Sequence, residues 1–188
     1  ECHFTHSFQS NTHTHTHTLK TQVRALRPAS KCLDELSRQI MSPYILSASK
    51  QLDLAISGMH SETFSDNNTN TGTSSFYIRR VCNSISILKK YFQSFTSNYK
   101  SEMIGEMKII LCRHVICNFV RHASLIRPLS ETGKLRLTQD MTQLELSLAQ
   151  IVTDTSSLGW VYEELRAFRQ LLFLETDAVA QLLSLIHI

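Results

Sequence analysis

The most informative segment of the chain is RHASLIRPLSETGKLRLTQDMTQLEL, residues Arg121–Leu146. One segment with helical periodicity ends within it and a second one begins. Pro128 has no backbone N–H to donate and keeps Arg127 out of the α region, so the first helix is predicted to end at about Ile126. Ser130 can cap the next helix, because its side chain accepts a hydrogen bond from the first turn. The stretch therefore predicts two helices joined by a corner at residues 127–133.

Apolar stripes flank this corner on both sides. In the segment from Glu102 to Ile126, spacings of four, three, four and three join Met103, Met107, Ile110, His114 and Cys117. After the corner, the same spacings join Leu137, Met141, Leu144, Leu148 and Ile151. Two such helices with a short connection are expected to lie antiparallel and to pack against each other.

Two further segments before the stripes have helical periodicity. Residues 31–60 carry Ile45, Leu52, Ile56 and Met59 on one face. Pro43 interrupts this segment, which permits either two helices or one long kinked helix; we favour the single helix. Residues 76–99 are predicted to form a helix rich in aromatic residues. Its aromatic side chains are expected on the buried face and its basic side chains are expected off that face, which favours a core helix over a surface that binds nucleic acid.

The ends of the chain differ in character. Residues 1–30 are of low complexity, with His and Thr alternating from Thr12 to Thr18, and are predicted to be disordered. Residues 31–188 are predicted to form a helical bundle with a long polar loop at residues 61–75. The last helix is expected at residues 158–183, with Trp160 and Tyr162 as its bulky anchors. The sequence thus predicts an all-α fold, an elongated bundle of long antiparallel helices.

Composition excludes several classes of protein. A net charge of +3 is far from the basic balance of a nucleic-acid binder. Five cysteines, irregularly spaced, argue against a disulfide framework and for a reducing compartment. No run of residues approaches the length of about 18 apolar residues that predicts a membrane-spanning helix.

Chemical motifs are also missing. The most suggestive cluster is Cys112, His114, Cys117 and His122, but only residues three or four apart share a helix face, so just His114 and Cys117 can meet. Gly133 and Lys134 lack the remaining residues of a phosphate-binding loop. No carboxylate pair, nucleophile elbow or metalloprotease motif is present. We therefore expect no enzyme activity, no cofactor and no metal.

The amino-acid sequence of the corner closely resembles the C-terminal part of the fifth-subunit family of the conserved oligomeric Golgi complex. The resemblance rests first on the run Arg121–Leu129, then on Gly133, Lys134, Arg136, Leu137, Asp140, Gln143, Glu145 and Leu146, and later on Leu158, Gly159, Tyr162, Leu165, Arg166, Phe168, Arg169 and Leu171–Phe173. Ser130–Thr132 departs from the glycine-rich corner usual in the family, which suggests a stiffer corner. Gln170 replaces a usual proline, which leaves the last helix free to continue.

The resemblance implies a non-enzymatic scaffold in a multisubunit vesicle-tethering complex that acts in intra-Golgi retrograde transport. It implies a peripheral location on the cytosolic face of Golgi membranes, with association through the complex. Implied partners are the other subunits, the seventh above all, and more loosely SNARE and Rab proteins, with no nucleic acid. The candidate partner interface is the corner, with Arg127, Pro128, Gly133, Lys134 and Arg136.

Two other classes of protein stay open from sequence alone. A secreted four-helix cytokine would share the helix count and the glycosylation triplet that starts at Asn67. An all-α enzyme with a site in the core of its bundle is the second alternative.

Overall fold

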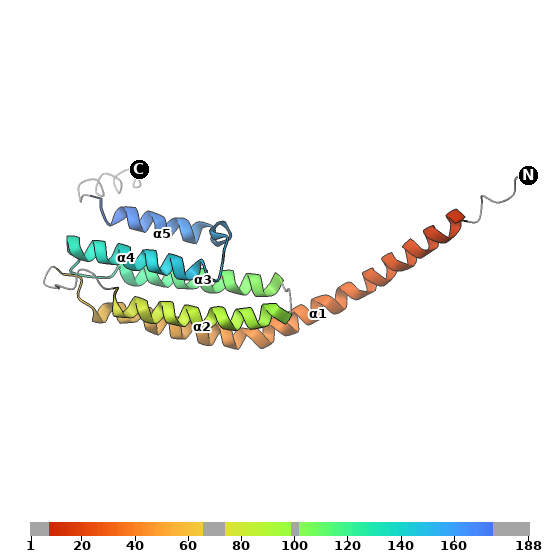
Figure 1. Ribbon diagram of the computed structural model, residues 1–188, viewed down its shortest axis with the longest axis horizontal. Coiled ribbons are helices and arrows are strands. Elements are labelled where there is room, and N and C mark those ends of the chain that lie inside the picture. Colours follow the sequence, from red (N-terminus) through yellow and green to blue (C-terminus); the bar gives the residue numbers. More distant parts are fainter. Residues whose placement is uncertain (1–7, 66–73, 99–101, 175–188) are drawn as a thin grey trace, which may run out of the picture. The chain divides into compact units, whose positions relative to one another are not determined.

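The structure is a computed structural model that describes residues 8–65, 74–98 and 102–174, with side chains described from residue 24 on except at residues 25 and 96–98. Its regular elements are, in order, α1 (Phe8–Ser57), η1 (Gly58–Ser61), α2 (Phe76–Asn98), α3 (Glu102–Ala123), α4 (Glu131–Leu148), η2 (Thr155–Leu158) and α5 (Trp160–Leu171), where η marks a short 3₁₀ helix (Figure 1). Within the described ranges there is no strand, and the prediction of an all-α bundle is confirmed.

Two compact units divide the chain within α1, between Tyr44 and Ile45. In the first unit, α1 is helical from Phe8 and continues through Pro28 and Pro43, as the single-helix prediction requires at Pro43. Residues 8–30 are thus helical where disorder was predicted, and residues 1–7 lie outside the described ranges. No Gly or Pro interrupts residues 8–27, and His and Thr are only moderately poor helix formers, so local propensity permits this helix.

The second unit, Ile45–Ile188, is a helical bundle with an apolar core (Figure 1). The end of α1 contributes Leu52, Ile56 and Met59, three of the residues predicted for that face. The predicted stripe of α4 is buried throughout: Leu137, Met141, Leu144, Leu148 and, beyond the end of the helix, Ile151. Burial of each such side chain contributes about 1.5–3 kcal/mol. Among the described elements, the most extensive packing is between α2 and α4 and between α3 and α5.

Helix α3 buries a different arc from the predicted one. Met103 and Met107 are buried as expected, but Ile110 is exposed and His114 and Cys117 are only partly covered. The core side of the helix instead carries a broad set of buried side chains that includes Ile104, Leu111, Cys112, Val115, Ile116 and Phe119. Both α5 and η1 pack on α3, and Tyr77 of α2 reaches its Phe119. A narrow stripe of residues spaced four and three apart predicts the buried face of a helix that packs against one neighbour. Because several elements pack on α3, the stripe predicted the wrong centre for its buried face.

The last helix is shorter than predicted and is anchored differently. Gly159 has φ 61°, a left-handed conformation that favours glycine, and it separates η2 from α5. The sequence expected a helix over residues 158–183, whereas α5 ends at Leu171 and residues 175–188 lie outside the described ranges. Trp160 is 70% exposed, so the buried anchors are Val161 and Leu165.

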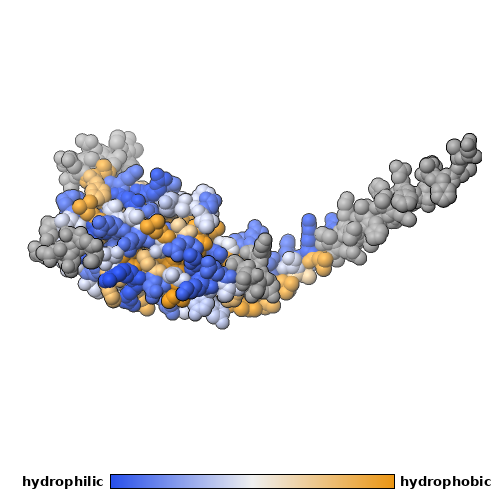
Figure 2. Space-filling model, viewed as in Figure 1, coloured by the Kyte–Doolittle hydropathy of each residue, from blue (hydrophilic) through white to orange (hydrophobic). Residues whose placement is uncertain are grey.

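The visible surface mixes hydrophilic residues with apolar patches (Figure 2). Among the described residues, no helix has both the length and the apolar character that crossing a membrane would require.

Candidate interaction site at the helical corner

The corner between α3 and α4 is longer than the sequence predicted. Helix α3 ends at Ala123, three residues before the expected Ile126. Three further backbone hydrogen bonds follow its end, from Ser124 N–H to Val120 O (2.9 Å), from Leu125 N–H to His122 O (3.1 Å) and from Ile126 N–H to Ala123 O (3.2 Å). Ile126 is buried, whereas the flanking residues Leu125, Arg127 and Pro128 are exposed. The corner therefore presents a mixed apolar and basic edge.

Ser130 performs the capping role that the sequence assigned to it. Its Oγ accepts a hydrogen bond from Gly133 N–H (3.1 Å) at the start of α4. The same hydroxyl donates to the carbonyl of Phe64 (3.0 Å), and the Ser130 N–H donates to that carbonyl as well (3.0 Å). Phe64 is buried and lies in the segment that follows η1. The cap therefore also attaches the corner to a part of the chain far away in sequence.

Gly133 makes this attachment sterically feasible. A Cβ atom at this position would lie 2.1 Å from the carbonyl oxygen of Phe64, far inside van der Waals contact. Gly133 is also buried. The sequence placed Gly133 in the partner interface, but its position indicates a packing role within the chain.

Arg136 is likewise engaged inside the chain. Its guanidinium pairs with the carboxylate of Glu62, donates from Nε to Ser75 Oγ (2.9 Å) and from Nη1 to Thr63 O (3.2 Å). It also lies over the ring of Phe64, with Cζ 5.4 Å from the centroid. The prediction that Arg136 faces a partner therefore needs correction. The sequence around Arg136 could not predict its contacts with residues 62–75, which come together with it only in the folded chain.

Lys134 differs from Arg136 in its contacts. Its Nζ lies 2.6 Å from Oε1 of Glu131, one turn earlier on α4, and Glu131 is itself exposed. Of the five corner residues predicted for the interface, Arg127 and Pro128 are exposed. The side chains of Lys134 and Arg136 are 23% and 20% exposed, but Lys134 pairs with the exposed Glu131 on its own helix, whereas Arg136 and the buried Gly133 contact a distant segment of the chain.

A buried polar network continues from Arg136 into the core, and sequence reasoning missed it. Asp140 is fully buried; its Oδ2 accepts from the Tyr77 hydroxyl (2.8 Å) and its Oδ1 from Ser75 N–H (3.3 Å). Burial raises the pKa of Asp140, although the hydrogen bonds from Ser75 and Tyr77 and the charge of Arg136 oppose the rise. Burial and the neighbouring Asp140 carboxylate raise the pKa of Tyr77 well above its usual value, so the phenol stays a donor.

The network joins the two described ends of the predicted polar loop. Glu62 Oε1 accepts from Tyr77 N–H (2.8 Å), while its other oxygen faces Arg136. Beyond Ser61, which ends η1, the described loop residues 62–65 and 74–75 are non-helical, as predicted, and residues 66–73, with the triplet at Asn67, lie outside the described ranges. The sequence did contain one indication of this network, because Arg136 and Asp140 are four residues apart and therefore lie on one face of the helix.

The four residues that were considered as zinc ligands lie in separate environments, and two of them have hydrogen-bond partners of their own. Cys112 is buried in the core, which raises the pKa of its thiol to about 12. His114 Nε2 lies 2.7 Å from Oδ1 of Asp53, and His122 Nδ1 lies 2.8 Å from Nε2 of His60. Burial also raises the pKa of Cys117. In the part of the chain that the structure describes, no three His, Cys, Asp or Glu side chains are arranged to hold a metal ion.

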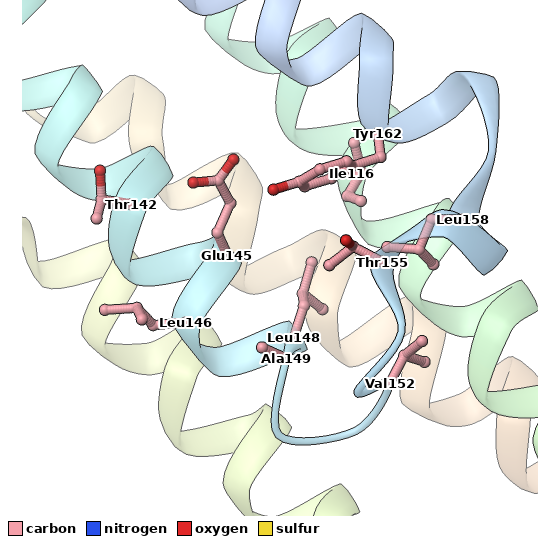
Figure 3. Close-up of a pocket in the computed structure, with 10 residues that line it drawn as sticks. All are labelled: Ile116, Thr142, Glu145, Leu146, Leu148, Ala149, Val152, Thr155, Leu158 and Tyr162. Carbon is pink, nitrogen blue, oxygen red and sulfur yellow. The ribbon is translucent and has the colours of Figure 1, made fainter.

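A cavity of about 260 Å³ lies beside α4 and α5 (Figure 3). Apolar side chains dominate its lining, among them Ile116, Leu148, Val152 and Leu158. Its one carboxylate, Glu145, points toward Tyr162 in Figure 3 and is held by Arg169 at 2.7 Å. The cavity can accept an apolar group, but its lining holds neither an acid–base pair nor an activated nucleophile.

Comparison with known proteins gives two close matches over most of the chain. The chain is 32% identical over 165 residues to conserved oligomeric Golgi complex subunit 5 of Mus musculus, covering 85% of this chain and 20% of the mouse protein. It is 32% identical over 161 residues to the subunit of the same name from Arabidopsis thaliana, covering 81% of this chain and 19% of the plant protein. The chain therefore spans about a fifth of the length of these relatives. No family model and no solved structure matches it.

Proposed function

The chain belongs to the family of conserved oligomeric Golgi complex subunit 5, to whose C-terminal region it corresponds, and we propose that it is a scaffold segment of a vesicle-tethering complex. In this proposal it has no catalytic role. It holds neighbouring subunits in place on the cytosolic face of Golgi membranes during retrograde intra-Golgi transport. Association with the membrane is peripheral and runs through the complex.

The observation that carries this proposal is the sequence relationship to subunits of an oligomeric Golgi complex. The proposal is also supported by what the charged side chains of the described residues do, since several of them hold segments of the fold together. Arg136, Asp140 and Arg169 connect separate segments of the fold, and Arg113 donates to the carbonyls of Ser157 (2.8 Å) and Leu158 (3.1 Å). Such use of charge fits a rigid protein–protein scaffold better than a reactive site.

We propose the corner surface, defined as Leu125, Arg127, Pro128 and Lys134, as a contact with a neighbouring subunit. Leu125 is 64% exposed and can be covered by an apolar partner surface. Arg127 and Lys134 add positive charge at the edge of this surface, where it steers and orients a partner more than it adds affinity. The seventh subunit is the proposed main partner, with SNARE and Rab proteins as secondary ones.

The test is binding of the full chain to the purified seventh subunit. Arg127→Glu with Lys134→Glu should weaken binding, and binding by the wild-type chain should fade as salt rises. The matched control is Lys50→Glu with Arg166→Glu, an equal change of charge at exposed positions elsewhere. Equal binding by wild type and the corner variant would reject the corner surface, and no binding by the wild-type chain would reject the seventh subunit as partner of this segment.

A secreted cytokine-like protein remains the alternative proposal to test. It requires paired cysteines, whereas Cys32, Cys82, Cys112 and Cys117 are free thiols in the structure. Mass analysis under non-reducing conditions after alkylation separates the two proposals, because a tether should be alkylated at its cysteines and a cytokine should not.

A further inference from the structure

The outer face of α2 carries large apolar side chains, including two aromatic residues that the sequence placed on the buried face. Tyr77 and Phe92 are buried, but Phe76 is 62% exposed, Tyr91 60% and Ile87 46%. Phe76, Ile87 and Tyr91 are spaced 11 and 4 residues apart, so they fall on one side of the helix. Two polar residues, Arg80 and Asn83, occupy the intervening positions on that side, and both are exposed.

The same helix is basic along its length. Within Phe76–Asn98 there are four cations, Arg79, Arg80, Lys89 and Lys90, and no Asp or Glu. Lys89 donates to the side chain of Gln150 (3.3 Å), and Arg79 lies over the ring of Phe76 with Cζ 5.8 Å from its centroid. Within the described ranges, Arg79, Arg80 and Lys90 form no ion pair. Their charge is therefore available to a partner.

We propose that the α2 face, defined as Phe76, Arg80, Asn83, Ile87, Lys90 and Tyr91, docks an acidic amphipathic helix of a partner protein. Residues 76, 80, 83, 87 and 91 are spaced four, three, four and four apart, which is the spacing of a helix–helix seam. Apolar side chains of the partner would cover Ile87, Tyr91 and Phe76. Carboxylates of the partner would lie opposite Arg80 and Lys90 and complement their charge.

The position of Arg80 favours a protein helix over a membrane surface. An interfacial helix immerses a continuous apolar face below the lipid headgroups. Here Arg80 and Asn83 interrupt the line between Phe76 and Ile87, so the face cannot enter hydrocarbon as a unit. A protein helix can instead place a carboxylate at that point and apolar residues on either side. In Figure 2, hydrophilic and apolar surface lie side by side over the part of the molecule where Figure 1 shows α2.

Nucleic acid is the other acidic partner to consider. Binding to a phosphate backbone needs a basic surface extended over several phosphates. The whole chain carries a net charge of only +3, and the cations of α2 are confined to one helix. The α2 face contains none of the residues of the corner surface.

The experiment uses the full chain and a labelled synthetic helical peptide of about 20 residues, long enough to form a helix, with Leu and Ile on one face and Glu around it. A second peptide replaces each Glu by Lys. Anionic phosphatidylcholine–phosphatidylserine vesicles and a labelled single-stranded DNA are the further probes. We expect the acidic peptide to bind at least about tenfold more tightly than the basic one, with an affinity that falls as salt rises.

Two variants test the surface itself. Arg80→Gln with Lys90→Gln should weaken binding of the acidic peptide roughly tenfold while leaving the unfolding midpoint unchanged, since both side chains are exposed. Tyr91→Ser should weaken binding through the apolar part of the face. The matched control is Arg121→Gln with Arg166→Gln, which removes equal charge from α3 and α5 and should bind like wild type.

The outcomes separate the alternatives. Loss of binding in both α2 variants but not in the control supports the proposal. Equal loss in the control would show nonspecific charge attraction and overturn it. Preference for vesicles or for DNA over the acidic peptide would also overturn it, as would unchanged binding in both α2 variants. None of these results involves the seventh subunit, so failure here is distinguishable from failure of the proposed function.

Discussion

The hydroxyl of Tyr77 donates a hydrogen bond of 2.8 Å to Oδ2 of Asp140, a residue without solvent exposure. This bond connects the first turn of α2 with the middle of α4. Ser75 and Arg136 extend it toward Glu62, so the segment on each side of residues 66–73 is fixed to the same helix. One polar network therefore holds both described ends of the polar loop against α4.

Tyr77→Phe should destabilise the fold, because it leaves the Asp140 carboxylate with one fewer donor in a buried site. The expected loss is about 1–3 kcal/mol in the free energy of unfolding, measured by chemical denaturation. Tyr91→Phe is the control, since Tyr91 is exposed and its change should stay within about 0.5 kcal/mol. Equal small effects of both substitutions would mean that the Tyr77 hydroxyl adds nothing to the network.

Gly133→Ala should be destabilising although alanine favours helices. The new Cβ would lie 2.1 Å from the Phe64 carbonyl oxygen, and overpacking of this kind costs about 1–3 kcal/mol. Gly105 is the matched control, because it is also helical and a Cβ there meets nothing within 4 Å. Gly105→Ala should therefore raise stability by about 0.5–1 kcal/mol. Thermal unfolding of the two variants should move in opposite directions; a rise for both would contradict the close approach.

The sequence predicted those features that depend on neighbours along the chain. Local spacing of apolar residues predicted the helical class of the fold and the buried face of α4. The hydrogen-bonding capacity of Ser130 predicted its role as the cap of α4. The sequence failed where a distant segment decides the outcome. Ile110 fell outside the buried arc because several elements cover α3, and Arg136 was assigned to a partner because Glu62 and Ser75 meet it only in the folded chain.

Leu144→Ala should cost about 2–5 kcal/mol, because the side chain is fully buried at the centre of the α4 stripe. Leu146 lies two residues further on the same helix and is 64% exposed. Leu146→Ala should therefore change stability by less than about 0.5 kcal/mol. Denaturant titration of the pair gives the comparison. If the two losses were alike, the stripe would not be the core face of α4.

Acidification should destabilise the bundle through His122. Burial lowers the pKa of His122 below its ordinary value of 6.5, and the charges of His60 and Arg121 lower it further, while Asp53 opposes them. The folded state then binds fewer protons than the unfolded state, so this contribution is lost as pH falls through 6.5 toward the lower folded pKa. Unfolding midpoints at about pH 7.5 and 5.5 compare conditions on either side of the ordinary value of 6.5. His122→Gln should reduce the difference between them, and an unchanged difference would exclude His122 as a source.

Lys134 and Arg136 both lie near the start of α4, two residues apart. Their substitution by Glu should nevertheless have very different effects on the free energy of unfolding. The side chain of Arg136 is 20% exposed and that of its partner Glu62 is 14% exposed. Arg136→Glu would put two carboxylates together near Asp140 and leave Ser75 Oγ and Thr63 O without their donor. Breaking a fully buried pair costs about 3–5 kcal/mol, and because both side chains here keep some exposure we expect a loss of about 3 kcal/mol.

Lys134→Glu should change stability by no more than about 1 kcal/mol. It breaks only the pair with the exposed Glu131, and exposed pairs contribute about 0–1 kcal/mol. A negative charge near the start of a helix is also favourable, which offsets part of the loss. A double-mutant cycle with Glu62→Gln and Arg136→Gln completes the test, because two residues of one network should show a nonadditive loss of about 0.5–3 kcal/mol. Additive losses in that cycle, or equal losses from Arg136→Glu and Lys134→Glu, would contradict the internal role of Arg136 and support its predicted place in the partner interface.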